Sequence, residues 1–238
     1  MAGSGFGTNF RITTWGETHG AGVGVVVDGC PAGLPLERED VQKYLDRRKP
    51  GQSKYTTQRK EGDQVEILSG IFEGRTTGTP ISMVVYNKDQ RSKDYSNIKD
   101  IYRPGHADFT FDMKYGFRDY RGGGRSSGRE TIGRVAAGAV AAKVLKELGI
   151  EIKAYAKAIA GIEVSKDHFD FAEMNNNPFN MPDKEAAKLV QEKADQMIKE
   201  MDSIGGIIEC QITGMPVGIG ETVFDKLDAE LSKAIMSI

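Results

Sequence analysis

Residues 122–148, GGGRSSGRETIGRVAAGAVAAKVLKEL, decide how we expect this chain to fold. Apolar side chains recur there at helical spacing, which predicts a long helix over 129–148 that Gly149 closes. Its alanines and Gly138 predict close contact with another helix, because small side chains let two backbones approach. The predicted buried side of the helix comprises Ile132, Val135, Ala136, Ala139, Val140, Val144, Leu145 and Leu148.

The glycines and serines that precede this helix predict an anion site. Backbone N–H groups at a helix N-terminus point outward, and the helix dipole favours negative charge there. Arg125 and Arg129 would add donors that suit phosphate. The stretch lacks the Lys-Ser/Thr pair of a Walker motif and the G-x-G-x-x-G spacing of a dinucleotide site. A glycine loop with solvated arginines is the alternative interpretation.

Outside this stretch, the sequence alternates between predicted strands and helices without a regular βα repeat. Short β-branched runs bounded by turn residues predict strands at 10–14, 22–28, 65–72, 81–86, 151–164 and 206–214. Helical spacing predicts helices at 37–48 and 183–202, and a last helix that begins at 224. The long segment 87–125 is poor in regular signals but rich in aromatics, which is typical of a functional loop. We therefore expect an α+β fold in a single domain over 1–238.

The bulk composition disfavours several classes of protein. The net charge is −2, from 32 basic and 34 acidic side chains, which disfavours a globally basic nucleic-acid binder. The N-terminus has no cationic start followed by an apolar run, and stretches such as 23–27 are too short to span a bilayer. Cys30 and Cys210 lie far apart with no His or Cys at metal-ligand spacing. We expect a cytoplasmic protein with two buried thiols, no disulfide and no metal site.

Two stretches concentrate positive charge within this nearly neutral chain. Residues 47–60, RRKPGQSKYTTQRK, hold six cationic side chains and no acidic one. Residues 118–134 hold five arginines against Asp119 and Glu130. Such a run is either a solvated face or part of a local anion site, and Pro50 within the first run favours a loop over a pocket.

Two of the three histidines are candidates for proton transfer. His19 lies within GETHG, just after a predicted strand, and His106 lies within RPGHAD, inside the long segment. Asp108 is two positions from His106 and is a candidate to orient its ring. For both histidines a purely structural role in a turn stays open, and we expect His168 to be exposed in its polar surroundings. Together with the arginines, these residues suit a small substrate with phosphate and carboxylate groups, and a phosphate-bearing cofactor.

Segments along the whole chain match the motifs of one known family, in the right order. They are residues 16–20, 25–31, 46–48, 55–59, 89–92, 94–95, 103–108, 124–131, 134–138, 202–206 and 224–228. So many long motifs in one order are highly specific. The chain therefore resembles chorismate synthase over its whole length.

The resemblance implies a carbon-oxygen lyase of the shikimate pathway, which supplies aromatic amino-acid biosynthesis. Such an enzyme converts 5-enolpyruvylshikimate 3-phosphate to chorismate and phosphate by an anti-1,4-elimination. Reduced FMN would supply electron density as phosphate departs, and NADPH would serve as reductant where the enzyme reduces its own flavin. The family fold is a β-α-β sandwich with long central helices between two antiparallel sheets, assembled as a homotetramer. The implied partner is this small molecule, with neither nucleic acid nor membrane.

The resemblance also implies roles for individual residues. His19 would protonate the leaving phosphate, and His106 would protonate the reduced flavin; imidazole suits both roles because it titrates near neutral pH. The substrate's anionic groups would be held by His19, Arg48, Lys54, Arg103 and Arg129. FMN would contact Arg125, Ser126 and Ser127, and NADPH would contact Arg48 and Lys54.

The sequence departs from the family pattern in three positions and in length. Thr18 stands where Ser is usual, Gly128 where Ala is common, and Lys54 where Arg is frequent, so Lys54 keeps the charge but loses bidentate geometry. Family members continue past residue 238, with further flavin-binding segments and a catalytic aspartate. We therefore expect a truncated member, incomplete for activity when alone. A nucleic-acid-binding module, identified by salt-sensitive polynucleotide binding, and a non-catalytic fragment are the rival interpretations.

Overall fold

The computed structural model describes residues 3–56, 62–88 and 98–238. They form two compact units, the first made of Met1–Pro50, Arg59–Leu148 and Val217–Ile238, and the second of Gly51–Gln58 and Gly149–Pro216. Each unit combines an antiparallel sheet with helical structure, so the expected α+β class is confirmed. The expectation of a single domain stays a prediction.

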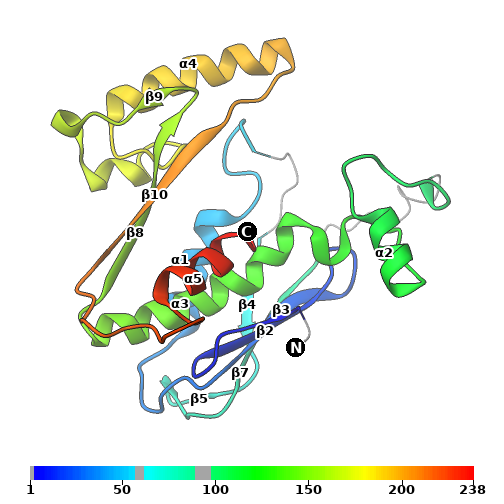
Figure 1. Ribbon diagram of the computed structural model, residues 1–238, viewed down its shortest axis with the longest axis vertical. Coiled ribbons are helices and arrows are strands. Elements are labelled where there is room, and N and C mark those ends of the chain that lie inside the picture. Colours follow the sequence, from blue (N-terminus) through cyan, green and yellow to red (C-terminus); the bar gives the residue numbers. More distant parts are fainter. Residues whose placement is uncertain (1–2, 57–61, 89–97) are drawn as a thin grey trace. The chain divides into compact units, whose positions relative to one another are not determined.

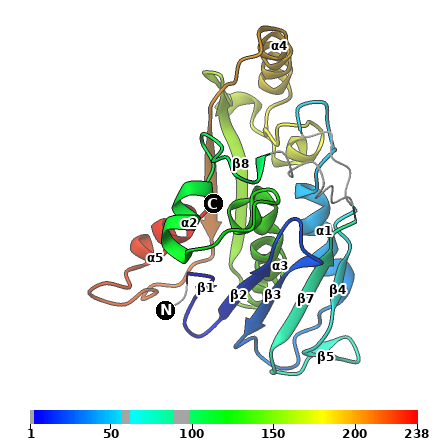
Figure 2. The same cartoon turned by 90° about the vertical axis from the view of Figure 1, so that its right-hand side faces the viewer.

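The first unit is built on a five-stranded antiparallel sheet. Its strands follow the order β1-β2-β3-β7-β4, as Figure 2 shows. Their bounds are β1 Gly5–Phe6, β2 Arg11–Gly16, β3 Gly22–Asp28, β7 Ile81–Tyr86 and β4 Val65–Ile67. The bounds predicted for β3 and β7 are confirmed, since both are apolar runs that form the centre of the sheet.

Two helices cover one face of this sheet, α1 (Arg38–Arg48) and α3 (Thr131–Glu147), and Figure 1 shows them with the strands. Alternate residues of β3 and β7 point toward them, because successive strand residues face opposite sides. The shared core contains Val23, Val25, Val27, Ile81, Met83, Val85, Val41, Leu45, Ile132, Ala136 and Val140. Full burial of each such aliphatic side chain contributes about 1.5–3 kcal/mol, which fixes the helices on the sheet.

Small residues on α3 allow this close packing, although Gly138 is not one of them. At Gly133, an added Cβ would lie 3.0 Å from the carbonyl oxygen of Gly24 in β3, so this glycine sets the approach of helix to sheet. Gly138 is exposed and its Cβ would meet nothing within 4 Å, so its predicted role in helix contact is wrong. Leu148 is also exposed rather than buried, because α3 ends one residue earlier.

Two expectations for the first unit are corrected. The single strand expected over 65–72 is divided into β4 and β5 (Ile71–Phe72), which pairs with β6 (Arg75–Thr76). Gly70, with φ +82°, turns the chain between them, and a Cβ there would lie 2.8 Å from the backbone of Ile81. The segment expected to be irregular contains helix α2 (Asp108–Tyr115), which ends at Gly116 in the left-handed conformation.

Short 3-10 turns and a last helix complete the first unit. The turns are η2 (Gly124–Ser126) and η3 (Gly128–Glu130), directly before α3. Helix α5 (Leu227–Ile235) begins three residues later than expected. Arg134 of α3 donates to the backbone oxygen of Ser237 and, over 3.0 Å, to its hydroxyl, which ties the end of the chain to α3.

The second unit is a long hairpin with one helix. Strands β8 (Glu151–Ile159), β10 (Gly206–Thr213) and β9 (Ile162–Glu163) form a sheet in the order β10-β8-β9 (Figure 1). The strand expected over 151–164 therefore turns back at 160–161. Helix α4 (Lys184–Glu200) is capped by Asp183, whose carboxylate accepts the backbone N–H groups of Glu185 and Ala186. The 3-10 turns η4 (Lys166–His168) and η5 (Phe171–Asn175) precede it.

The burial of the two cysteines and of His168 can be compared with the predictions made from the sequence. Cys30 is buried, and burial raises the pKa of its thiol. Cys210 is exposed on β10, so the prediction of two buried thiols is wrong for this one. His168 is exposed, as predicted, with its Nδ1 atom 3.5 Å from Glu185.

Candidate active site

A cavity of about 240 Å³ in the first unit gathers several of the predicted residues. Loop 103–108, helix α2 and the segment 117–126 line it, together with Glu17. Four of the predicted site residues are among its lining, namely Arg103, His106, Arg125 and Ser126. The motif RPGHAD and the glycine-serine loop therefore meet at one cavity, although they are separated in sequence by α2.

Arg103 is held firmly at this cavity by Asp108. Its Nε and Nη2 atoms each donate to the carboxylate over 2.8 Å, and its backbone N–H donates over 3.0 Å. Nη2 also donates to the carbonyl oxygen of Gly122 over 2.9 Å. Arg118 adds a second cation 3.3 Å from the carboxylate. Hydrogen bonds from Arg103 hold the pKa of Asp108 well below its usual range.

His106 lies on the same loop but has a different partner from the one expected. Its side chain is exposed, and its Nδ1 atom lies 3.2 Å from the carbonyl oxygen of Pro104. Asp108 is engaged with Arg103 and Arg118, so the prediction that it orients the His106 ring is wrong. A charged guanidinium is the stronger partner for a carboxylate than a neutral imidazole, which explains the difference.

His19 is a buried residue that packs against the glycine-serine loop. It is 9% exposed, and its Nδ1 atom lies 3.2 Å from the hydroxyl of Thr18. Its ring packs on Gly122, where a Cβ would lie 2.3 Å from Nδ1 and where φ is +72°. Gly122 and His106 line the same cavity, so His19 packs against a residue of that cavity's wall, although His19 is not itself a lining residue.

The glycine-serine loop offers backbone donors more than side-chain donors. In the described part of the chain, the backbone N–H groups of Gly123, Gly124 and Arg125 donate to no protein acceptor. The Arg125 guanidinium instead binds the carbonyl oxygens of Gly16 and Thr14, over 3.1 and 3.2 Å. It fastens the loop to the end of β2.

The two predicted serines of this loop have different surroundings. The Ser126 hydroxyl is exposed at the cavity and donates to the oxygen of Gly123 over 2.7 Å. The Ser127 hydroxyl accepts from the backbone N–H of Arg129 over 3.3 Å, which caps η3. Ser127 therefore has a local structural role, and it is not among the residues that line the cavity.

Arg48 and Arg129 meet on the carboxylate of Asp63. Nη1 of Arg48 donates to Oδ2 over 2.7 Å, and Nη1 of Arg129 lies 2.7 Å from Oδ1. The Asp63 side chain is fully buried, that of Arg129 is 6% exposed and that of Arg48 is 22% exposed. Burial lowers the pKa of Arg48; Asp63 opposes this effect, and the charge of Arg129 adds to it. Guanidiniums kept in such surroundings suit an anionic ligand.

Asn87 links this cluster to the turn that carries His19. Its Oδ1 atom accepts from Nε of Arg129 over 3.1 Å. Its Nδ2 atom donates to the carbonyl oxygens of Glu17 and Gly20, over 2.9 Å each. Hydrogen bonds from Asn87 thereby connect Arg129 to the His19 turn, and Glu17 of that turn also lines the cavity.

Lys54 belongs to the second unit. Its Nζ atom lies 2.7 Å from Oδ1 of Asp195, and the hydroxyl of Tyr55 donates to the same carboxylate over 2.8 Å. The assignment of Lys54 to the substrate site stays a prediction. The rest of the basic run, 57–60, and the motifs at 89–95 lie outside the described residues.

Sequence reasoning missed two residues of this site and misread a third. Asp63 and Asn87 received no role, and Asp108 received the wrong partner. Asp63 lies two residues before a predicted strand and Asn87 directly follows one, and site residues often lie at such positions. Their positions beside predicted strands could have indicated Asp63 and Asn87 as site residues, but not that both contact Arg129.

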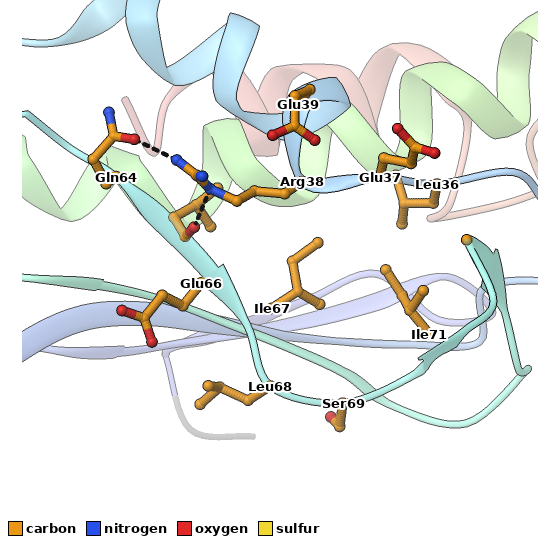
Figure 3. Close-up of a pocket in the computed structure, with 12 residues that line it drawn as sticks. Leu36, Glu37, Arg38, Glu39, Gln64, Glu66, Ile67, Leu68, Ser69 and Ile71 are labelled. Carbon is orange, nitrogen blue, oxygen red and sulfur yellow. Dashed lines mark hydrogen bonds between the residues drawn. The ribbon is translucent and has the colours of Figure 1, made fainter.

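A larger cavity of about 900 Å³ lies elsewhere in the first unit, between the start of α1 and β4–β5. Figure 3 shows Arg38 reaching across it to Gln64, and glutamates around an apolar floor. None of the predicted site residues, all of which are described, lines it. Because Glu37, Glu39 and Glu66 repel anions, this cavity does not suit a phosphate ester.

Metal ligation and membrane insertion find no support in residues 3–56, 62–88 and 98–238. No three His, Cys, Asp or Glu side chains gather there as a metal site would require. Nor does any helix in those ranges have the length and apolar character to cross a bilayer.

The chain is similar to proteins of one family throughout. The family model described as chorismate synthase matches residues 10–238. Chorismate synthases of Lachnospira eligens and Chloroflexus aggregans are 70% and 58% identical over all of this chain, which spans 65% of the length of each. A crystal structure of chorismate synthase matches with a TM-score of 0.77 at 30% identity, covering 97% of this chain and 67% of that one.

Proposed function

Because this chain belongs to the chorismate synthase family, we propose that it forms the larger part of an enzyme that eliminates phosphate from 5-enolpyruvylshikimate 3-phosphate to give chorismate. One observation carries the proposal: Arg48, Arg129 and the turn with His19 are joined in a single polar cluster, in which an ion pair links Arg129 to Asp63 and hydrogen bonds make the other connections. The chain spans 65% of the length of its Lachnospira eligens relative.

The arginines bind the substrate's anionic groups. Arg48 and Arg129 lie on either side of one carboxylate and suit phosphate or carboxylate through charge-assisted hydrogen bonds, each worth about 1.5–3 kcal/mol. Arg103, fixed by Asp108 at the cavity, holds a further anionic group. Lys54 is assigned to the same substrate by resemblance alone.

The two histidines move protons. His19, which is buried against Gly122, is assigned as the proton donor to the departing phosphate, because phosphate leaves more readily once protonated. His106, exposed at the rim of the cavity, exchanges a proton at a ring nitrogen with the group bound there. The resemblance assigns that group as the flavin.

Reduced FMN fits part of the donor set in the first unit. The N–H groups of Gly123, Gly124 and Arg125, which donate to no acceptor among the described residues, suit a phosphate group. Ser126 is assigned to the flavin by resemblance, since its hydroxyl donates to Gly123. The cavity of about 240 Å³ is smaller than the roughly 300–1,000 Å³ of typical ligand pockets, so it suits the phosphate end of FMN rather than the whole molecule. When bound, reduced FMN supplies electron density to the substrate as its phosphate leaves.

The remaining assignments follow from the family alone. We propose NADPH as a reductant that contacts Arg48 and Lys54, a homotetramer as the assembly, and the cytoplasm as the location. Ser127 is retained as a flavin contact by resemblance alone, since its hydroxyl caps η3.

A chimera tests the proposal. Residues 1–238 joined to the remaining part of the Lachnospira eligens relative should form chorismate from 5-enolpyruvylshikimate 3-phosphate with reduced FMN under anaerobic conditions. His106→Ala in the chimera should slow turnover by about 10²–10⁴-fold, and Arg48→Ala should raise the Michaelis constant about tenfold. His168→Ala, an exposed histidine of the second unit, is the matched control and should leave turnover unchanged.

A folded chimera without turnover would refute the proposed function. Unchanged turnover in His106→Ala would remove only its catalytic role, and an unchanged constant in Arg48→Ala would remove that residue from the site. Titration of the 238-residue chain with an unrelated polynucleotide tests the nucleic-acid alternative, which requires tight binding that 0.2 M salt abolishes.

A further inference from the structure

Arg129 is the point where two distant parts of the first unit are joined. Its Nη1 atom lies 2.7 Å from Asp63, which also accepts from Arg48 at the end of α1. Its Nε atom donates to Asn87, which donates in turn to the two carbonyl oxygens that flank His19. A continuous set of polar contacts therefore runs from the end of α1 to the His19 turn.

We propose that Asp63 and Asn87 are positioning residues that act through Arg129 to hold Arg48 and the His19 turn in one geometry for an anionic ligand. The inference rests on the proposed function for the identity of that ligand. The contacts themselves are independent of it, and neither residue was among the predicted site residues.

The surroundings of Asp63 leave its carboxylate little freedom. The side chain is fully buried, and φ is +41°, a left-handed conformation that few residues other than Gly, Asn and Asp adopt. Gln42 of α1 donates over 3.2 Å to its backbone oxygen. Because the backbone is fixed and both oxygens contact guanidiniums, Asp63 sets the separation of Arg48 and Arg129.

The amide of Asn87 is matched to its two tasks. Its oxygen accepts from Arg129, and its nitrogen donates to Glu17 and Gly20. An aspartate would lack the donors and a lysine would lack the acceptor, so an amide is required to join a guanidinium to two carbonyl oxygens. Asn87 follows β7, and its own N–H donates to Ala21 over 3.1 Å, which fixes it beside the turn.

Two substitutions test the positioning of the arginines by Asp63 and of the His19 turn by Asn87 separately. Asp63→Asn keeps the shape and tolerates the left-handed backbone while it removes the charge. Asn87→Leu removes both the acceptor and the donors at similar volume, and Asn87→Ala replaces it if the leucine variant does not fold. Asp40→Asn is the matched control, because Asp40 also links α1 to α3, through Lys143, outside the site.

Nuclear magnetic resonance of the 238-residue chain gives the readout that needs no ligand. In Asp63→Asn, solvent exchange of the Arg129 Nη–H groups should accelerate about tenfold or more, since the charged partner 2.7 Å from Nη1 is lost. In Asn87→Leu, the ring signals of His19 should shift, because the turn that carries this residue loses two hydrogen bonds. The signals of His106 and His168 are internal references, and Asp40→Asn should change none of these.

Kinetics of the chimera give the second readout. Asp63→Asn should raise the Michaelis constant about tenfold with little change in kcat, because it disturbs groups that bind the substrate's anion. Asn87→Leu should lower kcat, because it displaces the proton donor.

The outcomes separate this inference from the proposed function. An inactive chimera would refute the function, and the resonance measurements alone would then decide the positioning roles. Unchanged Arg129 exchange in folded Asp63→Asn, together with unchanged His19 signals in the folded Asn87 variant, would overturn the inference. Resonance changes with unaltered kinetics would also overturn it, since the contacts would then be structural.

Discussion

Asp63 and Asp108 each lie between two arginines of the first unit, but Asp108 orders a local loop whereas Asp63 positions side chains from separate elements. Asp108 accepts from the side chain and the backbone N–H of Arg103, five residues away, so its carboxylate shapes a local loop. Asp63 contacts only guanidiniums with its carboxylate among the described residues, and its own backbone is held by Gln42. A local pair therefore orders a segment of chain, whereas a non-local pair places side chains from separate elements.

The difference has an energetic consequence. Two charges removed from water repay their desolvation only when the geometry is good, and loss of one partner leaves the other charge buried and uncompensated. Asp63 is fully buried, while the Asp108 side chain is 8% exposed and its partner Arg103 is 18% exposed. We therefore expect a larger effect at Asp63, and the predictions below are ordered accordingly.

The largest effect is expected for Asp63→Ala. Removing the shared carboxylate from two largely buried arginines should lower the free energy of unfolding by about 3–5 kcal/mol. Urea denaturation followed by circular dichroism measures the loss, with Asp40→Ala as the control for an ion pair between α1 and α3. If Asp63→Ala loses no more unfolding free energy than Asp40→Ala, Asp63 contributes no more to stability than an ordinary ion pair, and the expected difference from Asp108 is contradicted.

A smaller and more local effect is expected for Asp108→Asn. The variant loses charge-assisted hydrogen bonds to Arg103, each worth about 1.5–3 kcal/mol, but keeps one neutral acceptor. Because the interaction is local, limited proteolysis should cut the loop 98–107 faster while the sheet core stays protected. Cleavage of the variant at the wild-type rate would show that Asp108 does not order this loop.

The pH dependence of stability sharpens the same comparison. Hydrogen bonds from Arg103 lower the pKa of Asp108 in the folded protein, so its contribution is complete above its unfolded pKa of about 3.9. That contribution is lost as pH falls through the folded value. The difference in unfolding free energy between wild type and Asp108→Asn should be constant from pH 7 to about 5 and shrink below about pH 4. A difference that grows with acid would contradict this assignment.

The smallest effect is expected for Asp195→Asn in the second unit. Asp195 binds Lys54 and Tyr55 on the surface, where solvent and salt screen the charges. The thermal midpoint of the variant should be indistinguishable from that of the wild type in a differential scanning experiment at 0.15 M salt. A clear fall in the thermal midpoint would show that the contacts of Asp195 with Lys54 and Tyr55 stabilise the fold as the buried ion pairs do.

Local patterns predicted much of the fold. The central strands β3 and β7 and the helices α1, α3 and α4 were placed within a few residues, because their apolar periodicity reflects burial on one face. Helix α2 was missed because its aromatics are largely exposed and give no clear apolar stripe. The sequence does contain the end signals of this helix, Asp108 in its first turn and Gly116 after its last, but these mark only where a helix begins and ends.

The site was predicted as a set of residues, not as a set of contacts. The motifs indicated Arg103, His106 and Ser126, which line one cavity. They did not indicate that Arg125 and Ser127 are engaged in binding β2 and capping η3. A side chain's free hydrogen-bonding capacity depends on neighbours from distant elements, which no motif contains.

The sequence by itself determined the family, the α+β class and the residue types that handle an anion, because these depend on local pattern and motif order. Only the tertiary structure decided which carboxylate each arginine meets and which turn Asn87 supports. The physical reason is that hydrogen bonds and ion pairs act over about 3 Å, and chain folding rather than sequence spacing brings such partners together.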